Sequence, residues 1–246
     1  MASLNGRAAL VTGGSRGIGA AIALRLAQEG ADVALTYVRD EQGAHEVVRK
    51  IESAGRRGVA LRADAADPAA VTAVVGRAAD ELGRLDILVN NAGIGVLGPI
   101  ETLTLADIDQ VLAVNVRAVF LASRAAAGRM ERGGRIIPIG SCMAQRVPGP
   151  GGTLYTTSKA ALTGLTKALA RELGSRGITV NLVHPGPIDT DMNPADGPYA
   201  ASQSGLTALG RFGTADEVAS VVAFLAGDEA AYMTGSEVVV DGGHAA

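Results

Sequence analysis

The sequence predicts a single α/β domain with a doubly wound fold, in which a seven-stranded parallel sheet carries helices on both faces. Short β-branched runs alternate with longer Ala- and Leu-rich stretches along all 246 residues. A cluster of glycines directly follows the first of these runs. Aromatic residues make up only 3% of the chain and Trp is absent. The core must therefore consist of small aliphatic side chains, which suit close packing of helices on a sheet.

Each expected strand is a short apolar run, mostly β-branched, that is bounded by polar or turn-forming residues. In chain order the strands are expected at Arg7–Thr12, Asp32–Tyr37, Val59–Ala63, Asp86–Asn90, Arg135–Gly140, Ile178–Val183 and Glu237–Asp241. Right-handed crossovers between parallel strands place all their carboxyl ends at one edge of the sheet, where ligands bind in such folds. We therefore expect the functional residues directly after the strand ends.

The intervening stretches have the length and composition of helices. They are expected at Gly17–Glu29, Glu41–Ala54, Pro68–Leu82, Leu105–Arg132, Leu154–Leu173 and Ala215–Ala226. Pro68 fits a first turn, because that position needs no N–H donor. The only long irregular stretch runs from Pro185 to about Ala208, and we expect residues 191–208 to form a lid. No repeat or linker divides the chain, so one domain is expected over residues 1–246.

The charge balance and the cysteine count exclude several partners. With 22 basic and 25 acidic residues the net charge is −3, so no basic excess would draw the protein to nucleic acid or to a membrane. No apolar run approaches the ~18 residues of a membrane span, and Met1–Leu10 lacks the apolar part of a secretory signal. Cys142 is the only cysteine, which excludes an intramolecular disulfide. We expect a cytoplasmic protein without a metal, because no His, Asp and Glu residues have ligand spacing.

A glycine-rich turn, Thr12-Gly13-Gly14-Ser15-Arg16-Gly17-Ile18-Gly19, joins the first expected strand to the first helix. Glycines let the backbone turn tightly and approach a pyrophosphate, whose charge is favoured by the N-terminus of the following helix. An ordinary tight turn is the alternative, since the chain contains 33 glycines. The position after strand one favours a nucleotide and a Rossmann-type fold. The residues expected to contact the dinucleotide here are Gly13, Ser15, Arg16, Gly17, Ile18 and Gly19.

Tyr155 and Lys159 are four residues apart on an expected helix, so both lie on the same face. A tyrosine with an ordinary pKa of ~10 is a poor acid or base at neutral pH, and a nearby ammonium lowers that pKa. Ser141 follows the fifth strand, where its hydroxyl could stabilise charge on a substrate oxygen. A nucleophilic role for Ser141 lacks support, because its neighbours form no G-x-S-x-G elbow.

The glycine turn, the later Asn90-Asn91-Ala92-Gly93, Ser141 and the Tyr155-Thr156-Thr157-Ser158-Lys159 segment together resemble the short-chain dehydrogenase/reductase family. The resemblance extends from about Leu4 to Gly243. It implies that Tyr155 transfers a proton and that Ser141 positions a carbonyl. Lys159 would tune Tyr155 and, with it, hold the nicotinamide ribose. Asn115 would bend its helix and support a proton relay to the lysine.

The same resemblance implies further cofactor contacts after the other strands. They are Asp64 at the adenine, Asn91, Ala92 and Gly93 along the cofactor, and Pro185, Gly186, Ile188 and Thr190 at the nicotinamide. For Asp64 the alternative is a cap on the helix that begins at Pro68. The alternative for Asn115 is a polar residue at a helix break. His184 is expected to be structural, because the family does not need it.

The end of the second strand favours NADP (NADPH) over NAD. A carboxylate at this tip would hold the ribose 2′-hydroxyl of NAD and repel a 2′-phosphate. The strand should stop near Tyr37, and Asp40 is expected to cap the next helix, so no acid stands at the tip. Arg16 and Arg39 flank the expected phosphate position and could clamp it. The alternative is that both arginines are solvated surface charges.

The expected function is hydride transfer between NADP and a ketone or aldehyde, or the reverse oxidation of an alcohol. An alternative is a 3-oxoacyl-carrier-protein reductase, since Arg132 and Arg176 could dock an acidic carrier. Against this, Cys142–Leu154 is one residue longer than in those enzymes. An alternative of another class is a cyclic-dinucleotide-binding regulator, because the 189–198 segment resembles the lid of a bacterial branch linked to biofilm dispersal. A homotetramer or homodimer is expected, as is common in the family.

Overall fold

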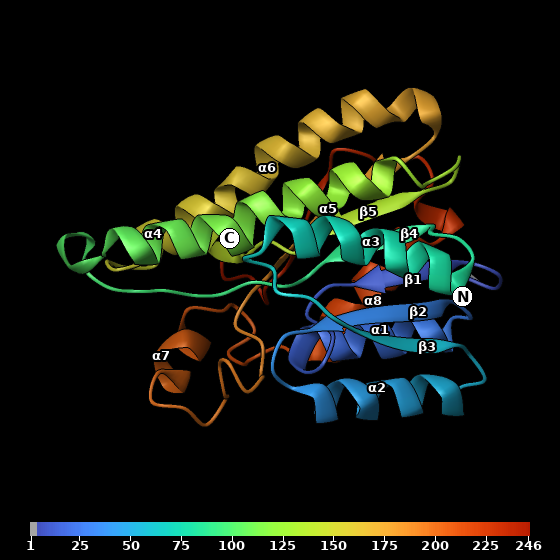
Figure 1. Cartoon of the computed structure of the whole chain (residues 1–246). Helices are drawn as coiled ribbons and strands as arrows, with labels where there is room; N and C mark the ends of the chain where they lie inside the picture. Colours follow the sequence, from blue (N-terminus) through green and yellow to red (C-terminus); the bar gives the residue numbers. More distant parts are fainter. Residues whose placement is uncertain (1–3) are drawn as a thin grey trace.

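A six-stranded parallel sheet organises the chain, of which the computed structural model describes residues 4–246. The strand order is β3-β2-β1-β4-β5-β6 (Figure 1). Their bounds are β1 (Ala8–Val11), β2 (Asp32–Tyr37), β3 (Gly58–Arg62), β4 (Ile87–Asn90), β5 (Arg135–Pro138) and β6 (Thr179–Val180). This is the predicted Rossmann-type α/β fold, and the first three residues of the predicted 1–246 domain lie outside the described part. The order reverses between β1 and β4, where such sheets bind ligands.

The predicted strand Ile178–Val183 is divided, so the predicted seven-stranded sheet is a six-stranded sheet followed by a two-stranded one. The chain leaves β6 at Asn181 and continues as β7 (Leu182–Pro185), which pairs in parallel with β8 (Glu237–Val240). The β5–β6 register continues to an isolated bridge between Ile139 and Val183, which places Pro138 opposite Leu182. Proline has no N–H to donate, so the β5 ladder is interrupted there and resumes one step later.

Helices cover both faces of the sheet, as the alternating pattern predicts (Figure 1). One face carries α1 (Gly17–Gln28), α2 (Glu41–Ser53) and α8 (Ala215–Ala226). The other carries α3 (Pro68–Leu82), α5 (Ala118–Ala127) and α6 (Thr153–Leu173). Their inward residues are mainly Ala, Val, Leu and Ile, so the two apolar layers consist of the small side chains that the composition requires.

The predicted long helix Leu105–Arg132 consists of three parts. A Thr104–Asp107 capping box begins α4 (Leu105–Leu112), a π-helical turn η2 (Ala113–Arg117) follows, and α5 continues from it. One extra residue per turn distorts a helix at this point, and such π-bulges occur frequently at functional sites. The distortion lies at Asn115, where the family resemblance implies a bend in the helix, and the helix ends at Ala127, before the predicted Arg132.

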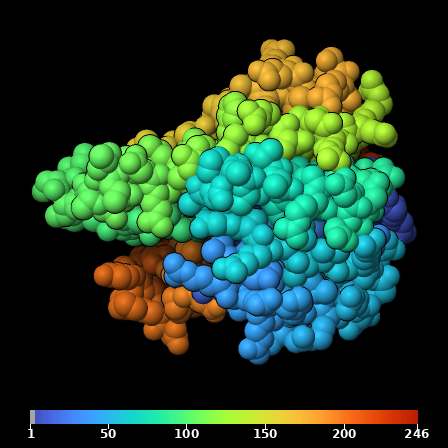
Figure 2. Space-filling view, in the orientation of Figure 1, coloured from blue at the N-terminus to red at the C-terminus, as the bar shows by residue number. Residues whose placement is uncertain are grey.

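The predicted irregular stretch contains one short helix, α7 (Ala200–Gly205). Reciprocal hydrogen bonds of 2.9 Å between the Asn193 and Gln203 amides join the two ends of the segment around it. In Figure 2 the 190–206 segment and the α4 segment project from the same end of the molecule. The remaining short 3-10 helices are η1 (Ile100–Thr102), η3 (Cys142–Ala144), η4 (Gly174–Arg176) and η5 (Asp228–Ala230). Across residues 4–246, no helix is long and apolar enough to cross a membrane.

Candidate active site

The carboxyl ends of β1 and β4 are held together by Thr12 and Asn91. The Asn91 side-chain amide donates to the Thr12 and Gly13 carbonyls over 3.0 Å, and the Thr12 hydroxyl accepts from the Asn91 and Ala92 amides over 3.0 Å. A Cβ on Gly19 would lie 2.2 Å from the Gly13 carbonyl oxygen. The glycine turn is therefore held in one tight shape, at the point where the strand order reverses.

The N-terminus of α1 is suited to an anion. Side chains cap α2, α3, α4 and α8, but the Arg16 side chain makes no cap bond at the start of α1. The amide groups of the first turn, from Gly17 to Gly19, therefore have no side-chain acceptor. Free amides at a helix N-terminus attract a phosphate. The predicted residues Ser15 and Ile18 lie in the same turn.

No carboxylate is free at the tip of β2. Asp40 accepts a hydrogen bond from the Gly43 amide over 3.0 Å and caps α2, as predicted. Arg39 is exposed beside it. The Arg16 guanidinium lies 3.7 Å from Asp191, with both side chains largely exposed, so the pair contributes little stability. Both arginines are accessible to a phosphate at this corner.

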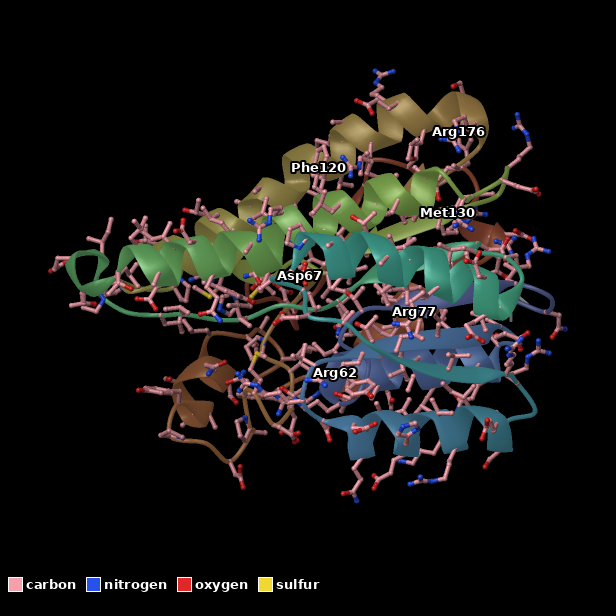
Figure 3. The ribbon with its side chains drawn as sticks, viewed as in Figure 1. Arg62, Asp67, Arg77, Phe120, Met130 and Arg176 are labelled. Atoms are coloured by element: carbon pink, nitrogen blue, oxygen red, sulfur yellow. The ribbon has the colours of Figure 1, made fainter. Side chains whose placement is uncertain are left out.

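Asp64 is not the cap of α3. That cap is Asp67, which accepts from the Ala69 and Ala70 amides, whereas Asp64 bonds the Ala66 amide over 2.8 Å in the preceding turn (Figure 3). The capping alternative for Asp64 is therefore wrong. One carboxylate oxygen of Asp64 has no bond of its own in this turn and could accept from an adenine amino group.

The turn after β7 packs closely on neighbouring backbone. A Cβ on Gly186 would lie 2.5 Å from the Asp241 backbone, which requires glycine in the Pro185-Gly186 pair. Ile188 is buried and pairs with Gly213 in an isolated bridge. A Cβ on Gly17 would lie 3.5 Å from a Thr190 methyl group. The predicted nicotinamide contacts thus border the glycine turn directly.

Tyr155 and Ser141 are brought together from α6 and the end of β5. The Ser141 side chain is close enough to the Tyr155 phenol to lower its pKa, and a Cβ on Gly95 would contact the Tyr155 ring at 3.9 Å. Burial raises the pKa of the Tyr155 phenol, and the nearby Ser141 side chain only partly offsets this effect. The predicted lowering of this pKa by Lys159 is not seen in this arrangement.

Lys159 is fully enclosed beneath Tyr155. Its Nζ donates to the Ile139 carbonyl over 3.0 Å and lies 5.8 Å from the centre of the Tyr155 ring. Burial lowers the pKa of the Lys159 ammonium to about 8. Lys159 therefore remains mostly protonated at neutral pH, although burial makes its proton easier to lose than that of an exposed lysine. A Cβ on Gly93 would lie 3.2 Å from Nζ, so glycine at this position keeps side-chain atoms away from the lysine.

Asn115 lies in the π-helical turn and is completely buried. Its side chain accepts from the Ile94 amide and donates to the Ile94 carbonyl, both over 2.9 Å, and also donates to Ser158 over 3.0 Å. Because Asn115 Oδ1 would lie 3.4 Å from a Cβ on Gly93, it faces the same space as Lys159. The structure thus brings all four predicted catalytic residues to one place.

Two polar residues of this region were not assigned from the sequence. Ser158 donates to the Tyr155 carbonyl over 2.7 Å and accepts from Asn115. Glu237 begins β8 and meets the buried His184 ring at 3.1 Å. A lone acid at the start of an otherwise apolar strand was the available signal for Glu237. Among the described residues, no three His, Cys, Asp or Glu side chains are grouped so that they could hold a metal ion.

Arg176 lies away from this site, at the amino end of the sheet. It donates to the Ala127 and Met130 carbonyls and so satisfies the end of α5 (Figure 3). Arg132 packs against Gly177 beside it, 2.9 Å from where a Cβ would be. The structural bonds of Arg176 do not support its predicted role in docking an acidic carrier.

Comparison with known proteins finds relatives that match nearly the whole length of the chain. A family model described as enoyl-(acyl carrier protein) reductase matches residues 13–245. A short-chain dehydrogenase from Burkholderia cenocepacia, solved in complex with NADP, is 57% identical, with a TM-score of 0.98 over 99% of both chains. A cyclic-di-GMP-binding biofilm dispersal mediator protein from Escherichia coli is 45% identical over 98% of both chains. A 3-oxoacyl-[acyl-carrier-protein] reductase from Staphylococcus aureus is 42% identical over 96% of this chain and 97% of its own length.

Proposed function

Because the chain belongs to the short-chain dehydrogenase/reductase family, we propose that it is an NADPH-dependent reductase of a ketone or aldehyde. The observation that carries the proposal is the placing of the Tyr155 phenol beside the Ser141 side chain, with the buried Lys159 Nζ 5.8 Å from the tyrosine ring. This trio lies at the carboxyl edge of the sheet, next to the uncapped N-terminus of α1. NADPH would supply the hydride when bound.

The four residues of the proposed site have different roles in the reduction. Ser141 and Tyr155 both direct hydroxyl groups at one point, where they would hold a carbonyl oxygen and stabilise its developing charge. Tyr155 would then give its proton to that oxygen. A phenol with a raised pKa remains protonated before the reaction, which suits a proton donor. Lys159, which is mostly protonated at neutral pH with its pKa of about 8, and Asn115 would restore the proton.

NADPH is favoured over NADH by the corner between β2 and the glycine turn. The tip of β2 offers Arg39 and no free carboxylate, because Asp40 is engaged as the cap of α2. Arg16 faces the same corner. Guanidinium groups bind a phosphate through paired hydrogen bonds. The NADP complex of the 57% identical Burkholderia protein supports the same assignment.

The substrate is proposed to be a carbonyl compound with an apolar body. Exposed apolar side chains stand on the three loops that follow β4, β5 and β7, and they are Leu97, Val147, Met192 and Tyr199. The Gly98 amide donates to the Gly151 carbonyl over 2.9 Å, which joins the first two loops into one wall. An apolar rim would favour a hydrophobic ketone over a charged one.

Two other functions are favoured by specific relatives. The 42% identity to the Staphylococcus enzyme favours a 3-oxoacyl-carrier-protein substrate, although Arg176 is engaged in structural bonds. The 45% identity to the Escherichia coli protein favours cyclic-di-GMP binding. A pure receptor would have no use for a buried Lys159 beneath a paired Tyr155 and Ser141, so we place reduction first.

One assay separates the three functions. NADPH oxidation is followed with a panel of apolar ketones and aldehydes, with an acetoacetyl carrier-protein thioester, and in the presence of cyclic-di-GMP. We expect turnover of at least one apolar carbonyl, with NADPH preferred to NADH. Turnover of the carrier-bound substrate alone would favour the second function. Binding of cyclic-di-GMP without turnover of any carbonyl would overturn the proposal.

A further inference from the structure

A buried histidine lies directly behind Ser141. His184 in β7 has no exposed surface, and its Nδ1 lies 3.2 Å from the Ser141 backbone nitrogen and 2.8 Å from the Ser141 carbonyl oxygen. Its Nε2 lies 3.1 Å from a carboxylate oxygen of Glu237 on the neighbouring strand β8. The ring thus bridges the last strand of the sheet to the backbone of a residue in the proposed site.

The Glu237 carboxylate determines which nitrogen of the His184 ring carries hydrogen. Hydrogen bonds from Lys167, Thr163 and His184 outweigh the effect of burial and keep the pKa of Glu237 below its ordinary value. Glu237 is therefore ionised at neutral pH and can only accept. Nε2 must then be protonated, which leaves Nδ1 to accept from the Ser141 amide in the neutral ring. In the charged ring, Nδ1 donates to the Ser141 carbonyl instead, so both forms bond the Ser141 backbone.

The surrounding backbone is shaped for this ring. A Cβ on Gly140 would lie 2.6 Å from His184 Nδ1 and 2.9 Å from the adjacent ring carbon, so only glycine lets the imidazole approach. The Gly140 amide bonds the Val183 carbonyl on the strand that carries the histidine. By contrast, residues 145–150 beyond Ser141 are exposed. The position of the Ser141 backbone therefore depends on its contact with His184 and not on the exposed residues that follow it.

We propose that His184, held by Glu237, is a positioning residue that fixes the Ser141 hydroxyl where it can meet the oxygen of a substrate. The proposal rests on the reductase function proposed above. His184 is separated from the open site by the Ser141 backbone, so it acts through that residue and exchanges no proton with substrate. Loss of its bond would remove the partner of the Ser141 amide in the neutral ring, or of the Ser141 carbonyl in the charged ring, and would leave this backbone less fixed. The charge on the substrate oxygen develops in the transition state, so kcat should fall more than KM rises.

Two substitutions distinguish positioning from packing. In His184→Asn the shorter side chain keeps a polar atom near the place of Nδ1, within reach of Ser141, and abandons Glu237. In His184→Gln the longer side chain fills more of the pocket and keeps a polar atom near the place of Nε2, but loses Ser141. If His184 only fills space, the glutamine variant should keep the higher kcat. If His184 positions Ser141, the asparagine variant should keep the higher kcat.

We expect His184→Gln to lower kcat at least about tenfold with KM changed less than about threefold, and His184→Asn to restore kcat to within about threefold of the wild type. NADPH affinity, followed by its fluorescence, should stay within about twofold in both variants, because the ring does not reach the glycine turn. Equal or higher kcat in the glutamine variant would overturn the proposal. Ser141→Ala in the same assay gives the loss that complete removal of the hydroxyl causes.

A measurement without substrate keeps this test separate from the proposed function. The chain has only three histidines, so long-range proton–nitrogen spectra of nitrogen-15-labelled protein identify His184 by its loss in His184→Asn. Hydrogen on Nε2, alone or with Nδ1, is the expected result. A neutral ring with hydrogen on Nδ1 alone would show that Glu237 does not hold the ring, and would overturn the proposed arrangement even if a carbonyl substrate is turned over. If the wild type reduces no carbonyl, the proposed function fails, and the spectrum still decides the ring geometry.

Discussion

At the scale of single residues, the polar groups of the site are fixed by backbone atoms. Lys159 bonds the Ile139 carbonyl, Asn115 bonds both polar atoms of Ile94, and His184 bonds Ser141. Backbone partners do not rotate away as side chains do, so each group is held before any ligand binds. Such preorganisation is the main source of electrostatic stabilisation in enzymes. Conservative substitutions here should therefore change rates more than binding.

Tyr155→Phe removes the proposed proton donor and little else. We expect turnover to fall by at least about a hundredfold, because general acid catalysis contributes 10²–10⁴. NADPH should still bind, since the glycine turn and α1 are untouched. Steady-state NADPH oxidation measures the first effect and NADPH fluorescence the second. Tyr232→Phe, at a fully exposed tyrosine, is the matched control, and retention of more than a few per cent of activity in Tyr155→Phe would remove Tyr155 from this role.

Lys159 should leave a signature in the pH dependence of stability. Burial lowers its pKa from the ordinary 10.5 to about 8, so the unfolded chain binds more protons between these values. The free energy of unfolding therefore gains from Lys159 as pH rises through that window, by about 3 kcal/mol in total. Urea unfolding at several pH values should show a smaller rise for Lys159→Met than for the wild type. The same rise in both proteins would contradict a buried ammonium, and exposed Lys50→Met serves as control.

Arg39→Asp should shift the cofactor preference from NADPH toward NADH. The change removes a proposed phosphate clamp and adds a carboxylate that repels the phosphate and accepts from a ribose hydroxyl. The ratio of kcat/KM for the two cofactors should fall at least about tenfold, as expected for loss of a charged hydrogen bond. Arg77→Asp makes the same charge change at an exposed position on α3 (Figure 3). A wild type that already prefers NADH would contradict the premise.

At the scale of elements, the hydrophobic pattern predicted most of the helices, while hydrogen bonds between residues distant in sequence determined where helices and strands are distorted or divided. Helices α1, α2, α3, α6 and α8 begin and end within a residue of their predicted bounds. A bend at Asn115 was expected from the family resemblance, but its form as a π-helical turn was not, because Asn115 bonds Ile94, which is distant in sequence. The division between β6 and β7 depends on Pro138 in another strand. Such features depend on contacts with another segment of the chain, so the sequence of one segment alone does not predict them.

In the candidate site, too, sequence motifs predicted some features, while others depend on contacts that form only in the folded chain. Tyr155, Lys159, Ser141 and Asn115 were predicted from motif and position, and their proximity follows from the parallel sheet. The Glu237–His184–Ser141 connection was not predicted, because β8 meets β7 only in the folded chain. Nor did spacing show that burial would lower the pKa of Lys159. Motifs therefore identified the groups, while burial and long-range pairing determined their ionisation.

The predicted lid around α7 should respond to ligands. Tyr199 within residues 194–206 and Met192 just before them are exposed, and the Asn193–Gln203 amide pair joins the two ends of this segment. Weakly buried segments open at low free-energy cost. We expect fast amide exchange over residues 194–206, and slower exchange with NADPH and an inhibitor together. Unchanged exchange there, with protection elsewhere in the pocket, would contradict the lid.

At the scale of the whole molecule, two apolar surfaces remain exposed. One lies on α4 and α5 and includes Leu105, Leu112 and Phe120 (Figure 3). The other lies on α8, β8 and the segment between them and includes Phe224, Tyr232 and Val239. Large apolar side chains grouped on a surface indicate contact with another molecule. Two separate surfaces of this kind are what a dimer of dimers requires.

We therefore predict that the protein forms a homotetramer or homodimer. Light scattering after size exclusion should give two or four times the 24.8 kDa mass of the chain. Phe120→Asp and Phe224→Asp should each reduce that mass, because a buried charge would oppose association. Leu97→Asp, at an exposed apolar residue on the substrate loop, should leave it unchanged. A monomer in the wild type would contradict the prediction.

The close approach of His184 to Gly140 also bears on the evolution of this fold. A methyl group at position 140 and an imidazole at position 184 cannot occupy the same space, since a Cβ there would lie 2.6 Å from Nδ1. The two positions should therefore change together among relatives, and lineages with a larger residue at 140 should carry a smaller one at 184. A lineage that loses the histidine would have to change position 184 before position 140, and a lineage that gains it would need glycine at position 140 first. This order of events makes the pair a historical record of when the histidine behind the serine was gained or lost.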